Sequence, residues 1–286
     1  MTRGFLAALA MLAAVVAAGC RVDVLAGTVR FATPHEMRVD DLEARLRGAC
    51  DEQSLLVLRD CLWQAGSLYP WADYQTLRLA VTRTEHRPLG EIETMEVWLL
   101  DLRGGRLRIE NQAAHIITVF DGWTWWTFVD GAETSDLQVR ADAYGEALLA
   151  RRLATLPFAL LAGRQKVKYV GTRTGPGEAR LWHRLLVTYP ASAAWNSGDE
   201  TVLEIEKGSR RLDAALIKWA DAPFMARPYR VDMDEWRDAG GLDLSRRWRL
   251  TPINEFGAPT GPVRYTLEVT SARFDVPTDV TTFIRP

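Results

Sequence analysis

The feature that most constrains this fold is a series of alternating apolar segments joined by short turns containing glycine. Gly104-Gly105 lies between Thr94–Leu102 and Leu107–Asn111. Asp121-Gly122 precedes the next such segment, Trp123–Val129. Turns of this kind connect antiparallel neighbours, whereas parallel strands need a crossover of a dozen or more residues. The sequence therefore predicts an antiparallel meander and excludes regular β-α-β winding.

Helical patterns lie before and within this series of strands. Apolar residues spaced four apart predict helices over 39–49 and 54–65. A longer helix is predicted over 137–161, and Pro157 breaks or kinks it. The other strand patterns are Leu77–Arg83, His115–Phe120, Val167–Arg173, Leu181–Tyr189, Thr201–Glu206, Ala214–Trp219, Asp243–Leu250 and Val263–Phe274. Helices and antiparallel strands in this order predict one α+β domain.

The first twenty residues have the composition of an export signal. Arg3 precedes an uncharged run that closes on Ala17-Ala18-Gly19-Cys20. The run is shorter than the roughly 20 apolar residues of a membrane-spanning helix. Its ending resembles the bacterial lipobox, whose cysteine is acylated and becomes the mature N-terminus. Ala17 stands where the lipobox prefers Leu, so ordinary signal-peptidase cleavage with an incidental Cys20 is the alternative.

This interpretation divides the chain into three parts. Residues 1–19 are expected to be a lipoprotein signal peptide, 20–37 a tether or linker, and 38–286 a single domain. Acyl groups on Cys20 would attach the protein to a membrane. Arg21 stands where an Asp would resemble a retention signal for the inner membrane. We therefore expect the protein in the bacterial cell envelope, anchored in the outer membrane and facing the periplasm.

Lipidation of Cys20 would leave Cys50 and Cys61 as a pair in an oxidising compartment. In one continuous helix over 50–61, their Cα atoms would lie about 16 Å apart, too far for a disulfide. A bridge therefore requires a break near Asp51–Gln53. The sequence leaves the paired and unpaired states open.

Composition and motifs give little support to several classes of function. A formal charge of -2, with 35 basic and 37 acidic residues, leaves no electrostatic footprint for nucleic acid. The four histidines lack metal-ligand spacing, and Asp232, Asp234 and Asp238 lack the glycine and distal Glu of an EF-hand. No G-x-S-x-G motif is present. We expect no catalytic residue, metal or cofactor, although a hydrolase using dispersed carboxylates stays open.

The most informative cluster is aromatic. Of the 11 Trp residues, three fall in the predicted strand 123–129. Because side chains alternate along a strand, both of its faces are apolar, and Val97-Trp98-Leu99-Leu100 behaves in the same way. The two faces need a cover on both sides, or a cover on one side and an apolar ligand on the other. The candidate cavity residues are Trp98, Trp123, Trp125, Trp126 and Phe128, about half of which should lie on the outer face. Filling of an ordinary core and stacking on sugars are the alternatives.

The order of several short motifs resembles that of LolA/LolB-like lipoprotein-sorting domains and related uncharacterised bacterial lipoproteins. The motifs are Leu62-Trp63-Gln64-Ala65-Gly66, Trp71-Ala72, Phe120-Asp121-Gly122-Trp123, Leu156-Pro157-Phe158, Trp236-Arg237-Asp238-Ala239-Gly240-Gly241 and the terminal Phe283-Ile284-Arg285-Pro286. The resemblance covers about residues 38–286. It implies a strongly curved, half-open antiparallel barrel with helices packed on its concave face, and a cavity between them that holds acyl chains.

The function expected from these features is that of a membrane-anchored lipoprotein. It would bind a lipid, an acyl chain or another apolar ligand in a cavity between sheet and helical lid, for transport, sorting or maintenance of the envelope. The alternative is a structural or protein-interaction lipoprotein with a filled core and no ligand. A lipid or lipoprotein is the expected partner, and nucleic acid is not.

Overall fold

The computed structural model describes residues 21–25, 28–32, 39–121, 124–161, 165–175, 180–189, 199–218, 228–278 and 280–283. The chain forms two compact units, Met1–Arg38 and Val39–Pro286. In the first, β1 (Arg21–Leu25) pairs antiparallel with β2 (Thr28–Ala32), within the segment expected to be a linker. The predicted signal peptide and Cys20 lie outside the described residues. No helix in the described ranges has both the length and the apolar character of a membrane span.

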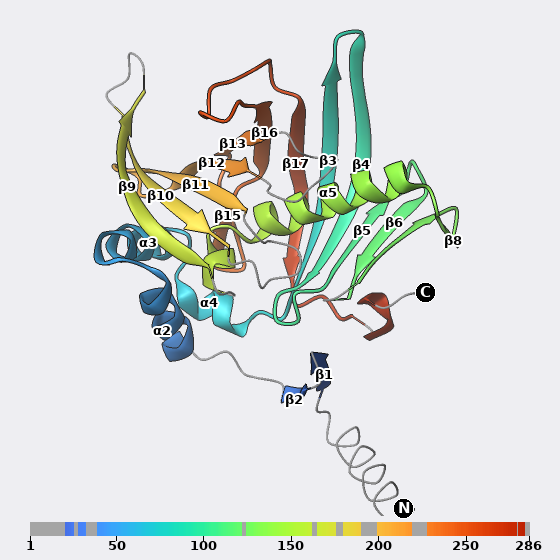
Figure 1. Ribbon diagram of the computed structural model, residues 1–286, viewed down its shortest axis with the longest axis horizontal. Coiled ribbons are helices and arrows are strands. Elements are labelled where there is room, and N and C mark those ends of the chain that lie inside the picture. Colours follow the sequence, from blue (N-terminus) through green and yellow to red (C-terminus); the bar gives the residue numbers. More distant parts are fainter. Residues whose placement is uncertain are drawn as a thin grey trace, which may run out of the picture. The chain divides into compact units, whose positions relative to one another are not determined.

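The second unit is built on one sheet of thirteen strands, and neighbouring strands are antiparallel throughout. In spatial order the strands are β8 (Ala132–Glu133), β7 (Trp125–Val129), β6 (Ile116–Phe120), β5 (Leu107–Asn111), β4 (Gly90–Asp101), β3 (Thr76–Arg87), β17 (Tyr265–Phe274), β16 (Arg247–Pro252), β13 (Tyr229–Asp234), β12 (Leu212–Lys218), β11 (Glu200–Glu206), β10 (Leu181–Thr188) and β9 (Lys166–Thr174). The sheet curves around helix α5 (Leu137–Thr155) and does not close into a barrel (Figure 1). The predicted α+β class is confirmed.

The last strand of the chain lies in the middle of this sheet. β17 pairs with β16 on one side and with β3 on the other, with Leu267 opposite Arg83. This contact joins a meander from the start of the unit to one from its end. The predicted strand 243–250 is divided in the structure. β15 (Leu242–Leu244) pairs with β14 (Arg237–Ala239) in a separate hairpin, and β16 begins only at Arg247.

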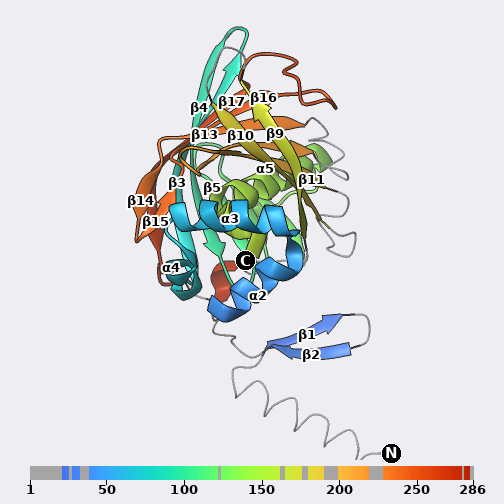
Figure 2. The ribbon, with the colours of Figure 1, turned by 90° about the vertical axis from the view of Figure 1, so that its left-hand side faces the viewer.

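Three helices precede the sheet in the chain: α2 (Val39–Ala49), α3 (Glu52–Gln64) and α4 (Leu68–Asp73) (Figure 2). Asp51 separates the first two, because its side chain accepts a hydrogen bond from the Ser54 amide at 2.8 Å and caps α3. The same carboxylate accepts from the Tyr169 amide at 3.0 Å, and the Ser54 hydroxyl donates to the Val167 carbonyl. The cap therefore also covers part of the free edge of β9.

Glycine is required where α3 ends. Gly66 has φ +108°, and a Cβ on it would lie 2.1 Å from the carbonyl oxygen of Gly241, in the turn between β14 and β15. Next to this contact, the Asp243 amide donates to the Ala65 carbonyl at 2.9 Å. A side chain at position 66 would separate these backbones. The predicted helix stop is therefore also a point of tertiary contact.

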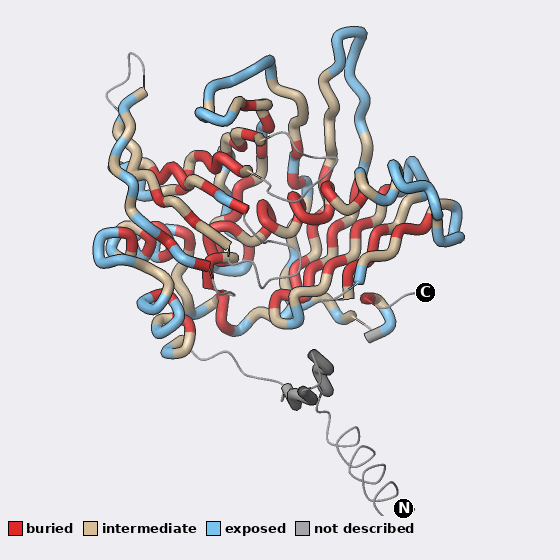
Figure 3. The backbone as a smooth tube through the Cα atoms, in the orientation of Figure 1, coloured by how far each residue is buried: buried red, intermediate tan, exposed pale blue. Residues whose placement is uncertain are grey.

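The core lies between the helices and the concave face of the sheet (Figure 3). Trp71 of α4 stacks on Phe158 of the short helix η1 (Phe158–Leu161), with ring centroids 4.8 Å apart. Both side chains are buried, as are Leu42 and Leu46 of α2. Pro157 ends the long helix, as its sequence predicts, and the chain continues as η1. These contacts fill the end of the sheet that carries α2, α3 and α4.

The outer face of the sheet has a cover of its own. Helix η2 (Val280–Phe283) follows β17, and its Thr282 carbonyl lies 3.5 Å from Arg108 Nη1 on β5. The Arg106 guanidinium lies over the Phe283 ring, 4.9 Å from the centroid, and Phe283 is fully buried. Side chains at 106 and 108 point away from Leu107, which is on the concave face. The C-terminal segment therefore packs on the outer face.

Replacing Phe283 with Ala should destabilise the protein by about 3–5 kcal/mol, the usual range for a buried Phe that leaves a cavity. Urea denaturation would measure this. Thr282→Ala is the matched control, because the contact with Arg108 uses the main-chain oxygen of Thr282. Equal stability of the two variants would show that the C-terminal segment does not contribute to the fold.

Candidate functional site: the interface between helix α5 and the sheet

Helix α5 changes from exposed to buried along its length. Asp136 caps its start by accepting from the amides of Gln138 and Val139, and the first turns lie largely in solvent. Every residue over 147–150 is buried, and so are those over 152–154. The C-terminal half is therefore part of the core. The N-terminal half contributes much less buried area.

The concave face beneath α5 becomes more polar from row to row. Residues paired across strands share a face, so the register defines rows that run across β3, β4, β5, β6 and β7. The first row is apolar throughout: Leu77, Leu100, Leu107, Phe120 and Trp125. The second is Leu79, Trp98, Ile109, Thr118 and Thr127, and the third is Val81, Glu96, Asn111, Ile116 and Val129. Arg83 and Thr94 form the start of the next row. We call the apolar rows the floor of this face. We call the charged residues beside them, beginning with Arg83 and Glu96, its polar rim.

Two of the aromatic residues predicted to line a cavity lie on this face. Trp125 stacks on Phe120 at 4.2 Å and meets Tyr144 of α5 edge to face, with centroids 5.0 Å apart. Trp98 is 2% exposed and lies parallel to Trp248 of β16, with centroids 5.9 Å apart. The Trp125 side chain therefore belongs to the interface with α5, and Trp98 lies on the same face of the sheet.

The other predicted residues lie elsewhere. Trp126 and Phe128 alternate with Trp125 along β7, so they point to the outer face. Val119 is opposite Trp126 and is fully buried on that face. Trp123 is outside the described residues. Helix α5 thus covers the concave face beside Trp125, and η2 packs against the outer face of β5.

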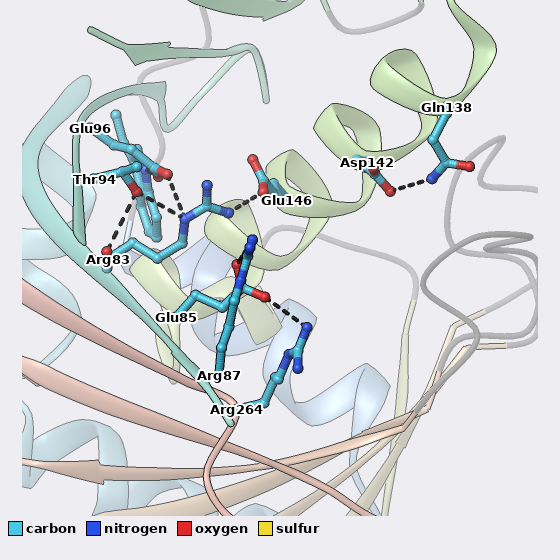
Figure 4. Close-up of polar contacts among 10 residues, drawn as sticks. Arg83, Glu85, Arg87, Thr94, Glu96, Gln138, Asp142, Glu146 and Arg264 are labelled. Atoms are coloured by element: carbon cyan, nitrogen blue, oxygen red, sulfur yellow. Dashed lines mark hydrogen bonds and ion pairs between the residues drawn. The ribbon is translucent and has the colours of Figure 1, made fainter. Parts of the chain in front are cut away.

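At the polar rim, Arg83 extends from β3 between two carboxylates (Figure 4). Its Nε atom lies 3.0 Å from Glu96 Oε1 on β4, and its Nη1 atom contacts Glu146 Oε1 on α5. Glu96 also accepts a hydrogen bond from Trp98 Nε1 at 2.8 Å. The Glu96 side chain is 3% exposed and that of Glu146 is 36% exposed. An ion pair thus links the partly exposed half of α5 to the floor of the sheet.

The rim carries one positive charge between two negative ones. Burial raises the pKa of the Glu146 carboxyl, an effect that Arg83 opposes and Glu96 reinforces. Desolvation disfavours the charged form of Arg83, but Glu146 and Glu96 outweigh this and raise the pKa of the guanidinium. Arg83 therefore stays charged, and burial favours the protonated form of Glu146.

A second charged group lies beside the rim (Figure 4). Glu85 accepts hydrogen bonds from Arg87 and Arg264, both at 2.7 Å. The bond from Arg87 is the main cause that lowers the pKa of Glu85. On α5, Gln138 donates to Asp142 at 2.9 Å, within the helix. The described surroundings of the partly exposed half of α5 are thus rich in charges.

The buried half of α5 has a different ion pair. Arg152 Nη2 lies 3.0 Å from Asp199 Oδ2, and both side chains are 5% exposed. Arg152 also donates to the Thr201 hydroxyl on β11 and lies over the Tyr189 ring at 4.6 Å. Breaking a buried pair costs far more than breaking an exposed one. The C-terminal half of α5 is therefore firmly fixed to the sheet, and the N-terminal half less so.

Two small hollows are lined entirely by described residues. The first lies between α5 and the sheet, among Leu79, Leu153, Leu156, Met233 and Trp248. The second lies beside α3 and includes Cys61, Pro157 and Leu212. Each has a volume of about 10 Å³, room for about one water molecule. The first hollow, between the C-terminal half of α5 and the sheet, therefore has no room for an acyl chain in this conformation.

The described residues do not form a metal centre of three or more His, Cys, Asp or Glu side chains. Of the acidic cluster considered in the sequence, Asp232 pairs with Arg230 and Asp234 with Arg249. Asp238 accepts from the Gly241 amide at 2.9 Å. Each of the three therefore has a structural partner.

Cys50 and Cys61 are free thiols in the structure. The helix break that a disulfide would need is present at Asp51, but Cys61 lies nine residues into α3, about 14 Å along its axis at 1.5 Å per residue. Burial raises the pKa of Cys61 to about 12, and burial is also the main cause that raises the pKa of Cys50. Neither sulfur is a thiolate near neutral pH.

Similar folds occur in solved structures. A LolA superfamily protein from Nitrosomonas europaea aligns over 82% of this chain and 97% of its own, with a TM-score of 0.52 and 12% identity. A DUF1329 family protein from Desulfovibrio piger aligns over 86% of this chain and 95% of its own, with a TM-score of 0.50 and 10% identity. This chain has a LolA-like fold. No protein-family model matches the LolA-like chain, and no curated protein matches it in sequence.

Replacing Glu146 with Gln should change how stability depends on pH. A carboxyl whose pKa is raised by folding stabilises the protein fully below its unfolded pKa, and this contribution is lost as the pH rises through the folded pKa. The free energy of unfolding of the wild type, relative to E146Q, should therefore fall as the pH rises from about 4 toward neutral. Urea denaturation across this range would measure the difference. A difference that rises with pH would contradict the prediction.

Proposed function

We propose that this protein is a lipid-anchored protein of the bacterial envelope that holds the acyl chain of a lipid or lipoprotein between α5 and the sheet. The observation that carries the proposal is the change of polarity along the concave face. Apolar rows lie below α5, and the charged rim of Arg83, Glu96 and Glu146 lies at one edge. An amphipathic molecule has the same division into an apolar chain and a polar end. Binding sites are commonly apolar with a few placed polar groups.

The unequal attachment of α5 gives the ligand a way in. The N-terminal half is attached to the rim through the partly exposed Glu146, whereas the C-terminal half holds the buried pair of Arg152 and Asp199. Partly exposed ion pairs contribute little to stability. Outward movement of the N-terminal half would uncover Trp125 and the apolar rows around it. We propose this movement as the step that admits the acyl chain.

The cellular location is part of the same proposal. The export-like sequence ending in Ala-Ala-Gly-Cys supports acylation at Cys20 and attachment to the outer membrane, facing the periplasm. The LolA-like fold is compatible with this location, because one structure of this fold belongs to a protein described as a member of the LolA superfamily. Sorting or maintenance of envelope lipids is the role that these features favour.

A second candidate is a structural or protein-interaction lipoprotein with a filled interior. The two hollows of about 10 Å³ and the parallel contact of Trp98 with Trp248 favour it. In this case α5 is a permanent part of the core. The two candidates differ in whether α5 can leave the sheet without unfolding the protein.

Native mass spectrometry of protein extracted from membranes tests the first candidate. We expect co-purified lipid, and uptake of a fluorescent fatty acid by the lipid-free protein. Repeated absence of both would contradict lipid binding and favour the filled core.

The same uptake assay can test α5 as a lid. E146Q should accelerate uptake because it weakens the link between α5 and Arg83. Asp142→Asn is the matched control, since Asp142 lies one turn away and its hydrogen bond to Gln138 stays within the helix. Equal rates in E146Q and D142N would show that the link at the rim does not control entry.

Cys20→Ser tests the anchor. Incorporation of labelled palmitate should be lost in this variant, and the protein should leave the membrane fraction. Cys50→Ser is the control, because a free, half-buried thiol inside the folded unit should not affect acylation. Unchanged labelling of the Cys20→Ser protein would refute the assignment.

A further inference from the structure

Two buried indole groups in the interior have no hydrogen-bond acceptor among the described residues. They are the Nε1–H groups of Trp236, in the loop after β13, and of Trp248, on β16. Both side chains line the hollow between α5 and the sheet. A buried donor without an acceptor lowers stability, because its hydrogen bond to water is lost on folding. Native structures contain few such groups, and each calls for an explanation.

Other tryptophans of the chain have the partners that these two lack. Trp98, which stacks on Trp248, donates to Glu96 at 2.8 Å. Trp182 of β10 donates to Asp213, also at 2.8 Å. An acceptor for a buried indole is thus available elsewhere in this fold, and its absence at Trp236 and Trp248 is specific to the hollow.

The walls of the hollow limit which acceptor can fill it. Leu79, Leu153, Leu156 and Met233 are apolar, and no basic side chain is among the described residues that line it. The Ser245 hydroxyl is engaged, since it lies 2.9 Å from the carbonyl oxygens of Asp234 and Arg247. A carboxylate would be buried there without a counter-charge, at a high cost. A neutral carbonyl oxygen has the right charge and about the size of the water that the hollow can hold.

We propose that Trp236 and Trp248 bind the carbonyl oxygen of an ester- or amide-linked acyl chain. This inference rests on the proposed function, because the attached chain would lie on the apolar rows that movement of the N-terminal half of α5 uncovers, and only the carbonyl oxygen would enter the hollow beside Leu153. Trp236 also lines the second hollow, beside α3. Met233 is an unbranched side chain that adapts readily to a chain lying against it. The site selects acylated molecules over plain hydrocarbons.

Two probes of equal chain length test this: methyl palmitate, and hexadecyl methyl ether, which lacks the carbonyl. Each is used to displace a bound fluorescent fatty acid. We expect the wild type to bind the ester about fivefold to tenfold more tightly, as one or two net hydrogen bonds imply. Trp248→Phe and Trp236→Phe should lower this ratio toward one while the ether still binds. Trp182→Phe is the control, because its N–H bonds to Asp213 outside the hollow.

A second measurement does not depend on affinity. In the infrared spectrum, the stretch of ¹³C-labelled carbonyl in bound methyl palmitate should move to lower frequency in the wild type and return in the double variant Trp236→Phe, Trp248→Phe. Equal binding of ester and ether by the wild type, without a shift, would overturn the inference and leave the hollow as a site for water. Lipid binding itself would then still stand. Failure of both probes to bind would instead contradict the proposed function as well.

Discussion

The fold depends on the need to cover a strand that is apolar on both faces. In β7, Trp125 points to one face and Trp126 and Phe128 to the other, so water on either side would be unfavourable. On the concave face, α5 supplies the cover, with Tyr144 against Trp125 and the C-terminal half of the helix buried on the sheet. On the outer face, the C-terminal helix η2 packs against β5 and buries Phe283.

The cover on the concave face is attached unevenly, and the proposed movement of α5 rests on this difference. Arg152 and Asp199 hold one half of α5 by a buried ion pair, while Glu146 holds the other half from a partly exposed position. The weaker attachment, at Glu146, also carries excess negative charge, because the single charge of Arg83 is paired with both Glu96 and Glu146. A helix fixed at one end and loosely held at the other can uncover apolar surface without global unfolding. This property separates a lid from a core helix.

Much of the architecture could be read from local patterns. The helix over 39–49 and the strand over 107–111 have the predicted bounds, and Pro157 ends the long helix as expected. β13 was missed, although Tyr229, Val231 and Met233 alternate with polar residues in the manner of a strand. The strand predicted over 243–250 is two strands, because Ser245 bonds to the main chain of both Asp234 and Arg247. That bond involves a residue eleven positions away, which no local pattern records.

The sequence by itself determined the class of the fold, since alternation and glycine turns act between neighbours in the chain. It also determined that both faces of the Trp-rich strand are apolar. Only the tertiary structure decided which element covers which face, because this depends on β17 pairing with β3 across almost the whole unit. Tertiary structure also decided two local arrangements. They are the rim of Arg83, Glu96 and Glu146, and the unpartnered indoles of Trp236 and Trp248. Their members are distant in sequence, and a charge or a donor acquires its partner, or lacks one, only when the chain is folded.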